Sequence, residues 1–176
     1  MSYHQNNRII DQETFRETVF VFRDEMYRFA KRFLLSTDEA QDVVQDQMMK
    51  FWQMKDRLQQ YTNLRAFVLK CVKNECLNRL KHQEVRMNFA SSEYDRKDYC
   101  TSEINNLKEQ IIGFIDKLPE KQRMVMHLKD VEEYNVDEIS DILAMETNAV
   151  RVNLMRARQK VKEQISQLMN YENRTL

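Results

Sequence analysis

The scarcity of glycine and proline constrains this chain more than any other feature, because its 176 residues contain one of each. Tight turns between β-strands depend on these residues and on asparagine and aspartate, so a sheet protein of this length would need them every few positions. Helices joined by short polar turns have no such need. The expected fold class is therefore all-α.

Composition excludes several other classes of protein. Hydrophobic residues make up 42% of the chain and charged residues 32%, which is typical of a globular protein. No apolar run approaches the ~18 residues of a membrane span, and the first residues lack the apolar core of a secretion signal. Cys71, Cys76 and Cys100 are unevenly spaced and, even with His82, fit no common zinc pattern. We expect a cytoplasmic protein with reduced thiols and with neither a metal nor a cofactor.

Hydrophobic periodicity predicts three helices in the first half. Apolar residues at steps of three and four predict a first amphipathic helix over 14–35. A second helix begins near Thr37, where a hydroxyl followed by two acids favours a helix start, and runs to about residue 58. Asn63 is the expected cap of a third helix over 64–86.

A polar stretch without helical periodicity divides the chain. Residues 87–103 form a longer connection than is usual inside a domain, so we interpret them as a linker between two small helical domains, residues 1–86 and 104–176. The chain is neutral, with 28 Lys+Arg against 28 Asp+Glu, yet the segment from Lys55 to Arg86 contains eight bases and three acids. The neutral total therefore conceals basic patches.

Acidic and basic residues are separated most clearly in the second half of the chain. Seven acids and no base lie from Asp130 to Glu146, whereas five bases and no acid lie from Val150 to Lys162. A short amphipathic helix, a turn near Ala144 and a longer basic helix form the helix-turn-helix pattern, whose second helix enters the major groove of DNA. Positive charge on that helix suits a position among phosphates. Alanine stands where such turns usually have glycine, which costs about 1 kcal/mol if the backbone there is left-handed.

Three segments resemble one known family. The segment LPEKQRMVMHLKDVEEYNVDEISDILAMETNAVRVNLMRARQKV is similar to region 4 of extracytoplasmic-function sigma factors, a sigma-70 subfamily of RNA polymerase initiation factors. The segment STDEAQDVVQDQMMKFWQMKDRL resembles their region 2.2, and NLRAFVLKCVKNECLNRLK resembles regions 2.3 and 2.4. Motifs of both regions in the right order are more specific than a lone helix-turn-helix.

The resemblance implies both a fold and a division of labour. A three- or four-helix region 2 domain would bind the clamp helices of the largest subunit of core RNA polymerase and read and melt the −10 promoter element. A region 4 domain would bind the flap of the second-largest subunit and read the −35 element. The family also implies an anti-sigma factor that masks the polymerase-binding faces, and no insertion into a membrane.

Three groups of site residues follow from the resemblance, position by position. The expected polymerase-binding residues are Asp42, Gln45, Asp46, Met49 and Trp52. The expected −10 contacts are Gln59, Gln60, Tyr61, Thr62, Asn63, Lys70, Lys73, Asn74, Asn78, Arg79 and Lys81. The expected −35 contacts are Asn148, Arg151, Val152, Met155, Arg156, Arg158 and Lys160.

The chemistry of these side chains suits the expected roles. The loop from Gln59 to Asn63 offers amides and an aromatic ring, which a base flipped out of the stack requires. On the basic helix the arginines suit guanine edges, and the exposed apolar side chains suit thymine methyl groups. Arg158 and Lys160 are expected on phosphates.

Several residues depart from the family pattern. Phe67 stands where tryptophan is frequent, and Val152 stands where serine or threonine is frequent. Val68 and Leu69 replace the aromatic pair that some primary sigma factors use for melting. Base preference is therefore expected to differ from that of better-known members.

Other interpretations stay open at this level. A stand-alone helix-turn-helix regulator with a helical sensory domain would bind promoter DNA without polymerase, and a helical adaptor would use its basic helix to bind a protein. Trp52 could belong to the core, and the basic helix face could simply be solvated. No enzyme is expected, because no nucleophile, P-loop or metalloprotease motif is present and His4, His82 and His127 are scattered.

Overall fold

The computed structural model describes residues 11–89 and 107–172, and all regular structure within these ranges is helical. The chain forms two compact units, Met1–Cys76 and Leu77–Leu176. The expected linker, 87–103, lies outside the described residues except for 87–89, which continue a helix. The domain boundaries given above therefore stay a prediction. Within these ranges, every helix is too short or too polar to span a bilayer.

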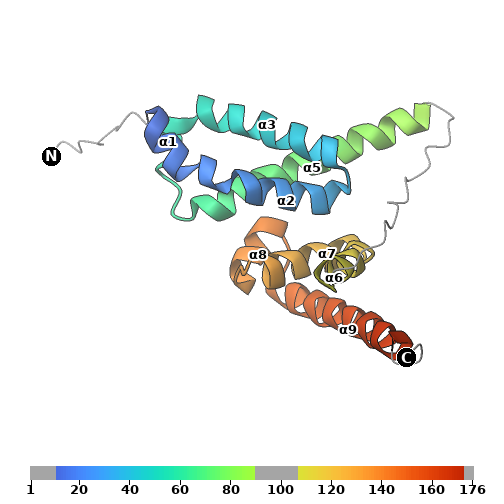
Figure 1. Cartoon of the computed structure of the whole chain (residues 1–176). Helices are drawn as coiled ribbons and strands as arrows, with labels where there is room; N and C mark the ends of the chain where they lie inside the picture. The colour runs from blue at the N-terminus through green and yellow to red at the C-terminus, as the bar shows by residue number, and fades with distance from the viewer. Residues whose placement is uncertain (1–10, 90–106, 173–176) are drawn as a thin grey trace. The chain divides into compact units, whose positions relative to one another are not determined.

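The first unit is built on antiparallel helices (Figure 1). Its elements are α1 (Gln12–Thr18), the 3-10 turn η1 (Phe20–Phe22), α2 (Arg23–Leu34), α3 (Thr37–Gln53), α4 (Lys55–Leu58) and the first half of α5 (Leu64–Phe89). The apolar positions of the sequence pattern are buried here, among them Met26, Phe29, Val43, Phe51 and Leu58.

Two of the expected helices are interrupted. The helix predicted over 14–35 breaks at η1, within a run of valine, phenylalanine and threonine that have low helix propensity. Phe20 and Val21 consequently point to solvent, 47% and 60% exposed. The second helix is interrupted at Met54, which separates α3 from α4. Its start is as predicted, except that the side chain of Ser36 is the cap, accepting a hydrogen bond from the Glu39 amide at 3.4 Å.

Besides the remainder of α5, the second unit contains α6 (Leu107–Asp116), α7 (Glu120–Met126), the π-helical turn η2 (His127–Val131), α8 (Val136–Leu143) and α9 (Thr147–Glu172). Its core includes the fully buried Tyr134, Leu128 and Ile139. The buried Arg123 donates to the carbonyl oxygens of Asp116 and Leu118 at 3.2 and 3.3 Å, which satisfies the end of α6.

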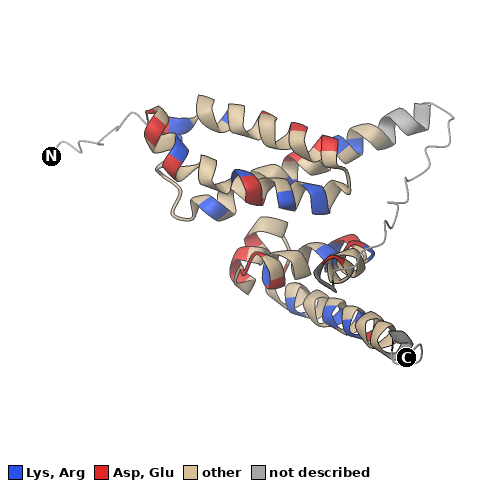
Figure 2. Ribbon diagram, viewed as in Figure 1, with Lys and Arg blue, Asp and Glu red and all other residues tan. Residues whose placement is uncertain are grey.

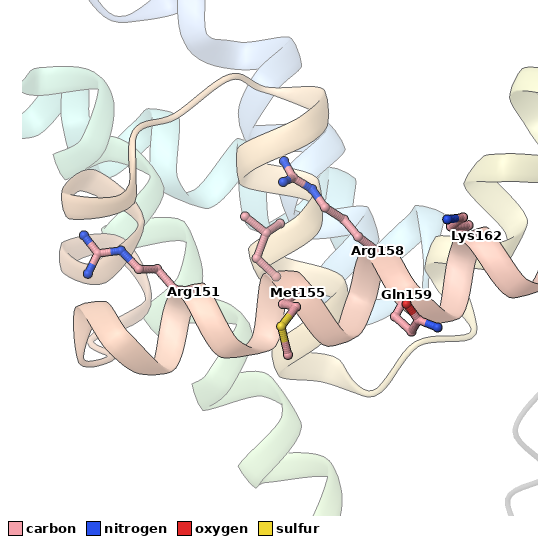
Figure 3. A pocket seen from close by; sticks show the side chains of 6 residues that line it. Arg151, Met155, Arg158, Gln159 and Lys162 are labelled. Atoms are coloured by element: carbon pink, nitrogen blue, oxygen red, sulfur yellow. The ribbon is translucent and has the colours of Figure 1, made fainter.

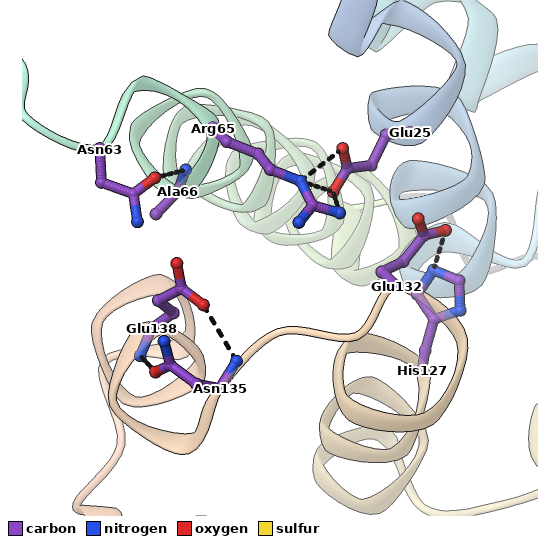
Figure 4. A network of polar contacts seen from close by, with 8 residues as sticks. All are labelled: Glu25, Asn63, Arg65, Ala66, His127, Glu132, Asn135 and Glu138. Atoms are coloured by element: carbon purple, nitrogen blue, oxygen red, sulfur yellow. Dashed lines mark hydrogen bonds and ion pairs between the residues drawn. The ribbon is translucent and has the colours of Figure 1, made fainter.

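Two residues at the beginning and end of α7 have structural roles. Pro119 is the residue immediately before the first turn of α7. His127 is 1% exposed, and its Nε2 lies 3.5 Å from the Glu132 carboxylate (Figure 4). This histidine therefore belongs to the core of the unit.

Candidate nucleic-acid interface

The turn between α8 and α9 is closed by a small set of backbone and side-chain bonds. Asn135 and Glu138 form a reciprocal capping box at the start of α8, with both bonds at 2.9 Å (Figure 4). At the end of α8 the backbone of Ala144 is left-handed, with φ 52° and ψ 51°. Ser140 then closes the turn, because its carbonyl accepts from the Met145 amide at 3.1 Å and its hydroxyl donates to the Met145 carbonyl. The helix-turn-helix geometry predicted from the sequence is confirmed.

Helix α9 buries one stripe and exposes the other face. Val150, Leu154, Ala157 and Val161 are buried. All of the residues expected on the −35 element are exposed, and the apolar ones are prominent, with Met155 65% and Val152 41% exposed. Arg151 donates to the Asn148 side chain at 3.3 Å, so these two polar side chains are already associated on the protein surface.

The exposed face of α9 contains a shallow hollow of about 370 Å³ with an apolar floor and a basic rim (Figure 3). It runs along one helix, so it is a surface feature and not an enclosed pocket. Basic residues lie along α9, whereas acidic residues gather on α8 and the segment before it (Figure 2). The residues that line the hollow are Arg151, Leu154, Met155, Arg158, Gln159 and Lys162.

Arg158 differs from the other bases of α9. Its Nε donates to Asp130 Oδ2 at 3.0 Å, and a terminal nitrogen donates to Asp130 Oδ1. The Asp130 carboxylate raises the pKa of the Arg158 guanidinium through this hydrogen bond and through its charge. Asp130 lies in η2, 28 residues earlier in the chain, and sequence spacing alone gives no signal of this pair.

The expected polymerase-binding residues lie on the solvent side of α3. Asp42, Gln45 and Met49 are exposed, and Asp46 is half-buried. Trp52 is 41% exposed and therefore not a core residue. Its ring makes an edge contact with Phe15 of α1 at 5.1 Å between centroids, and Lys55 Nζ lies 4.1 Å from its centroid.

The expected −10 loop between α4 and α5 is anchored by its own residues. Tyr61 stacks on Phe67, with centroids 3.6 Å apart and 19° between the rings. Asn63 caps α5 as predicted, accepting from the Ala66 amide at 3.0 Å (Figure 4). The other loop residues, Gln59, Gln60 and Thr62, are exposed.

An ion pair next to this loop fixes the start of α5. Arg65 Nε contacts both oxygens of the Glu25 carboxylate at 3.1 and 3.0 Å, and Glu25 is 8% exposed (Figure 4). The two residues lie 40 positions apart, so their spacing along the chain does not indicate the pair. It ties the helix that follows the loop to α2.

The exposed side of α5 carries most of the remaining −10 residues. Lys70, Asn74, Asn78 and Lys81 are exposed at helical spacing, and Arg79 is half-buried. Lys73 does not lie with them, because it is 7% exposed within the buried stripe. Burial, together with the charge of Lys70, lowers the pKa of Lys73. The structure therefore does not present Lys73 as a surface cation.

The cysteines of the described part are free thiols, Cys71 and Cys76. Burial raises the pKa of the Cys71 thiol, which disfavours the reactive thiolate. Cys100 lies outside the described residues. Within the described ranges no three His, Cys, Asp or Glu side chains gather as metal ligands would.

Two family models match the chain in the order expected. The model of sigma-70 region 2 matches residues 21–86, and that of sigma-70 region 4 matches residues 108–161. The ECF RNA polymerase sigma factor SigW of Bacillus subtilis is 24% identical over 175 residues, which cover 90% of this chain and 92% of that protein. The ECF RNA polymerase sigma-E factor of Salmonella typhimurium is 22% identical over 173 residues, with 90% of each chain covered.

Solved structures share the fold. The sigma factor RpoE in complex with the anti-sigma factor NepR, from Bartonella quintana, gives a TM-score of 0.75 at 18% identity, covering 88% of this chain and 98% of that one. CnrH in complex with the cytosolic domain of CnrY gives 0.60 at 18% identity, covering 89% and 90%.

Proposed function

Because the chain belongs to the extracytoplasmic-function subfamily of sigma-70 factors, we propose that its two units divide promoter recognition between them. The protein is a sigma factor, which binds core RNA polymerase and directs promoter-specific transcription initiation, and it is not an enzyme. The first unit, together with the second half of α5, would read and melt the −10 element, and the helix-turn-helix of the second unit would read the −35 element. The observation that carries this assignment is the exposed face of α9, the second helix of the helix-turn-helix, because it combines basic and apolar side chains.

The −35 assignment rests on the side chains that α9 offers to a major groove. Arg151 and Arg156 have the fork geometry that pairs with the O6 and N7 atoms of guanine. Val152 and Met155 lie exposed between them in the sequence and suit the methyl groups of thymine. A helix face that contacts only water does not require two large exposed apolar side chains between arginines. The combination therefore favours base reading.

The −10 assignment rests on the loop before α5. One face of the Tyr61 ring is covered by Phe67, which holds the ring in a fixed orientation. A rigid ring flanked by exposed amides is suited to receive an unstacked base, because little conformational entropy is lost when it binds. Exposed lysines and asparagines along α5 would follow the adjacent DNA backbone.

The polymerase contact is assigned to the exposed side of α3. An exposed tryptophan among acids and amides is typical of a protein interface. The proposed partner of this side of α3 is the clamp-helix element of the largest subunit of core polymerase. The proposed partner of the second unit is the flap of the second-largest subunit. An anti-sigma factor is a further proposed partner, as in the complex of the structural relative RpoE with NepR. The proposed place of action is the cytoplasm, where core polymerase works.

Trp52→Ala tests the polymerase contact. If Trp52 anchors the interface, the substitution should weaken core binding by about 2 kcal/mol, or roughly thirtyfold. Val21→Ala is the matched control, because Val21 is 60% exposed and apolar but lies outside the proposed surface. Binding is measured by competition for labelled core polymerase, with thermal unfolding measured in parallel. Equal affinity of the Trp52 variant and the parent chain would remove Trp52 from the interface.

A further inference from the structure

A carboxylate from outside the helix-turn-helix holds Arg158 of α9. The Asp130 carboxylate and the Arg158 guanidinium share two hydrogen bonds, one of them Nε to Oδ2 at 3.0 Å. Two parallel bonds fix both the distance and the orientation of a guanidinium, unlike a single contact. The Asp130 side chain is 27% exposed and that of Arg158 is 54% exposed, so the pair lies at the protein surface, where its geometric effect matters more than its energy.

Asp130 lies on a rigid support. In η2, the preceding His127 and Leu128 are 1% and 0% exposed. The backbone amide of Tyr134, which is fully buried, donates to the Leu128 carbonyl at 2.9 Å, and Lys129 Nζ donates to the Tyr134 carbonyl at 3.1 Å. A bond from Asp130 to α9 therefore links the helix to the core of the unit.

The pair lies at the far end of the base-reading segment. The near end of α9 is fixed by the turn at Ala144, and Arg158 lies about 16 Å further along the helix axis from Thr147. The proposed base-reading residues, Asn148–Arg156, lie between these two fixed points. On α9, Arg158 lies one helical turn from the buried residues Leu154 and Val161. The Asp130–Arg158 pair therefore borders the stripe of α9 that packs in the core.

We propose that Asp130 is a positioning residue for promoter recognition, and that it acts by holding Arg158 and thereby setting the orientation of α9 against the −35 element. Arg158 then serves as an internal clamp and not as a phosphate contact, which revises the role expected from the sequence. The inference rests on the proposed reading of the −35 element by α9.

The alternative role of Arg158 makes the opposite prediction. A phosphate would use the same guanidinium fork that Asp130 occupies. If Arg158 bound phosphate, removal of the Asp130 charge would release it, tighten DNA binding for all sequences alike and steepen the salt dependence. If the pair positions α9, removal of either partner should relax base preference at −35 and leave the salt dependence unchanged.

The test uses the full chain bound to core polymerase and a promoter library that varies at −35. Asp130→Asn, Arg158→Gln and the double variant are compared, with Asp141→Asn on the exposed side of α8 as the matched control for the charge change. Each single variant should lower the preference for the best −35 sequence by on the order of fivefold, and the double variant should be no worse than either single one. The Asp141 variant should equal the parent chain.

Three results would overturn the inference. They are tighter binding by Asp130→Asn, a salt slope lowered by about one in Arg158→Gln, and a lower unfolding temperature with base preference unchanged, which would mean a purely structural role. Arg151→Ala separates this inference from the proposed function. If that variant keeps the parent preference at every −35 position, base reading by α9 fails, whatever the Asp130 variants do.

Discussion

Ala144→Gly should stabilise the protein, although glycine normally weakens a helical protein. Ala144 has a left-handed backbone, with φ 52° and ψ 51°, which disfavours an L-residue by about 1–2 kcal/mol. Glycine relieves this strain but adds about 0.5–1 kcal/mol of unfolded-state entropy to be lost on folding. The alanine side chain is exposed, so little packing is lost. The expected net gain in the free energy of unfolding is about 0.5–1 kcal/mol.

The assay is urea unfolding followed by far-ultraviolet circular dichroism. The single tryptophan of the chain, Trp52, lies in the first unit, so its fluorescence is an internal reference that the substitution should not move. Ala149→Gly is the matched control, because Ala149 lies in the first turn of α9 and its carbonyl accepts from Asn153 at 2.8 Å. That substitution should destabilise by about 0.5–1 kcal/mol. If Ala144→Gly destabilises to the same extent, the turn is not left-handed and the helix-turn-helix geometry is wrong.

Three further predictions follow from other sites. Arg151→Ala should relax the base preference at one −35 position at a cost of about 1–3 kcal/mol of binding free energy. Lys160→Ala should instead weaken binding to all sequences alike and lower the salt slope by about one. Binding titrations against a −35 library check both. Glu25→Gln should destabilise the first unit by about 1–2 kcal/mol, because the half-buried Arg65 loses a charged partner, and unchanged unfolding monitored by tryptophan fluorescence would contradict this. Burial lowers the folded-state pKa of Lys73, which means that the charged lysine destabilises the fold at neutral pH. This loss of stability becomes smaller as the pH rises through the folded-state pKa, because the buried lysine is then neutral. Lys73→Met should therefore raise the unfolding temperature at pH 7, with a gain over the parent chain that shrinks in alkaline buffer, and a gain independent of pH would refute the argument.

The features that the sequence predicted correctly depend on local order along the chain. The buried stripe of α9 follows from a periodicity that any helix imposes, and the exposure of Arg151 and Met155 follows from the same periodicity. The cap by Asn63 and the left-handed Ala144 are likewise properties of short segments. These features define the two helical units and most of the residues that the proposed sites need.

The features that the sequence missed depend on contacts between distant segments. The Asp130–Arg158 and Glu25–Arg65 pairs join residues 28 and 40 positions apart, and a charged residue in a sequence does not show which partner it will meet. Lys73 was expected among the −10 contacts because of the family resemblance, but its place in the helix puts it on the buried stripe. The break at η1 was missed because apolar spacing continued through a segment of poor helix formers.

The most direct test of the central claim is run-off transcription with core RNA polymerase purified from the bacterium that encodes this chain. A template pool with randomised −10 and −35 elements is transcribed with and without the protein, and the transcripts are sequenced. A sigma factor should yield transcripts that start at a fixed distance from a common pair of elements, and only when the protein is added. Binding of the protein to DNA without polymerase, with no transcript dependent on it, would instead indicate a stand-alone regulator and would contradict the account.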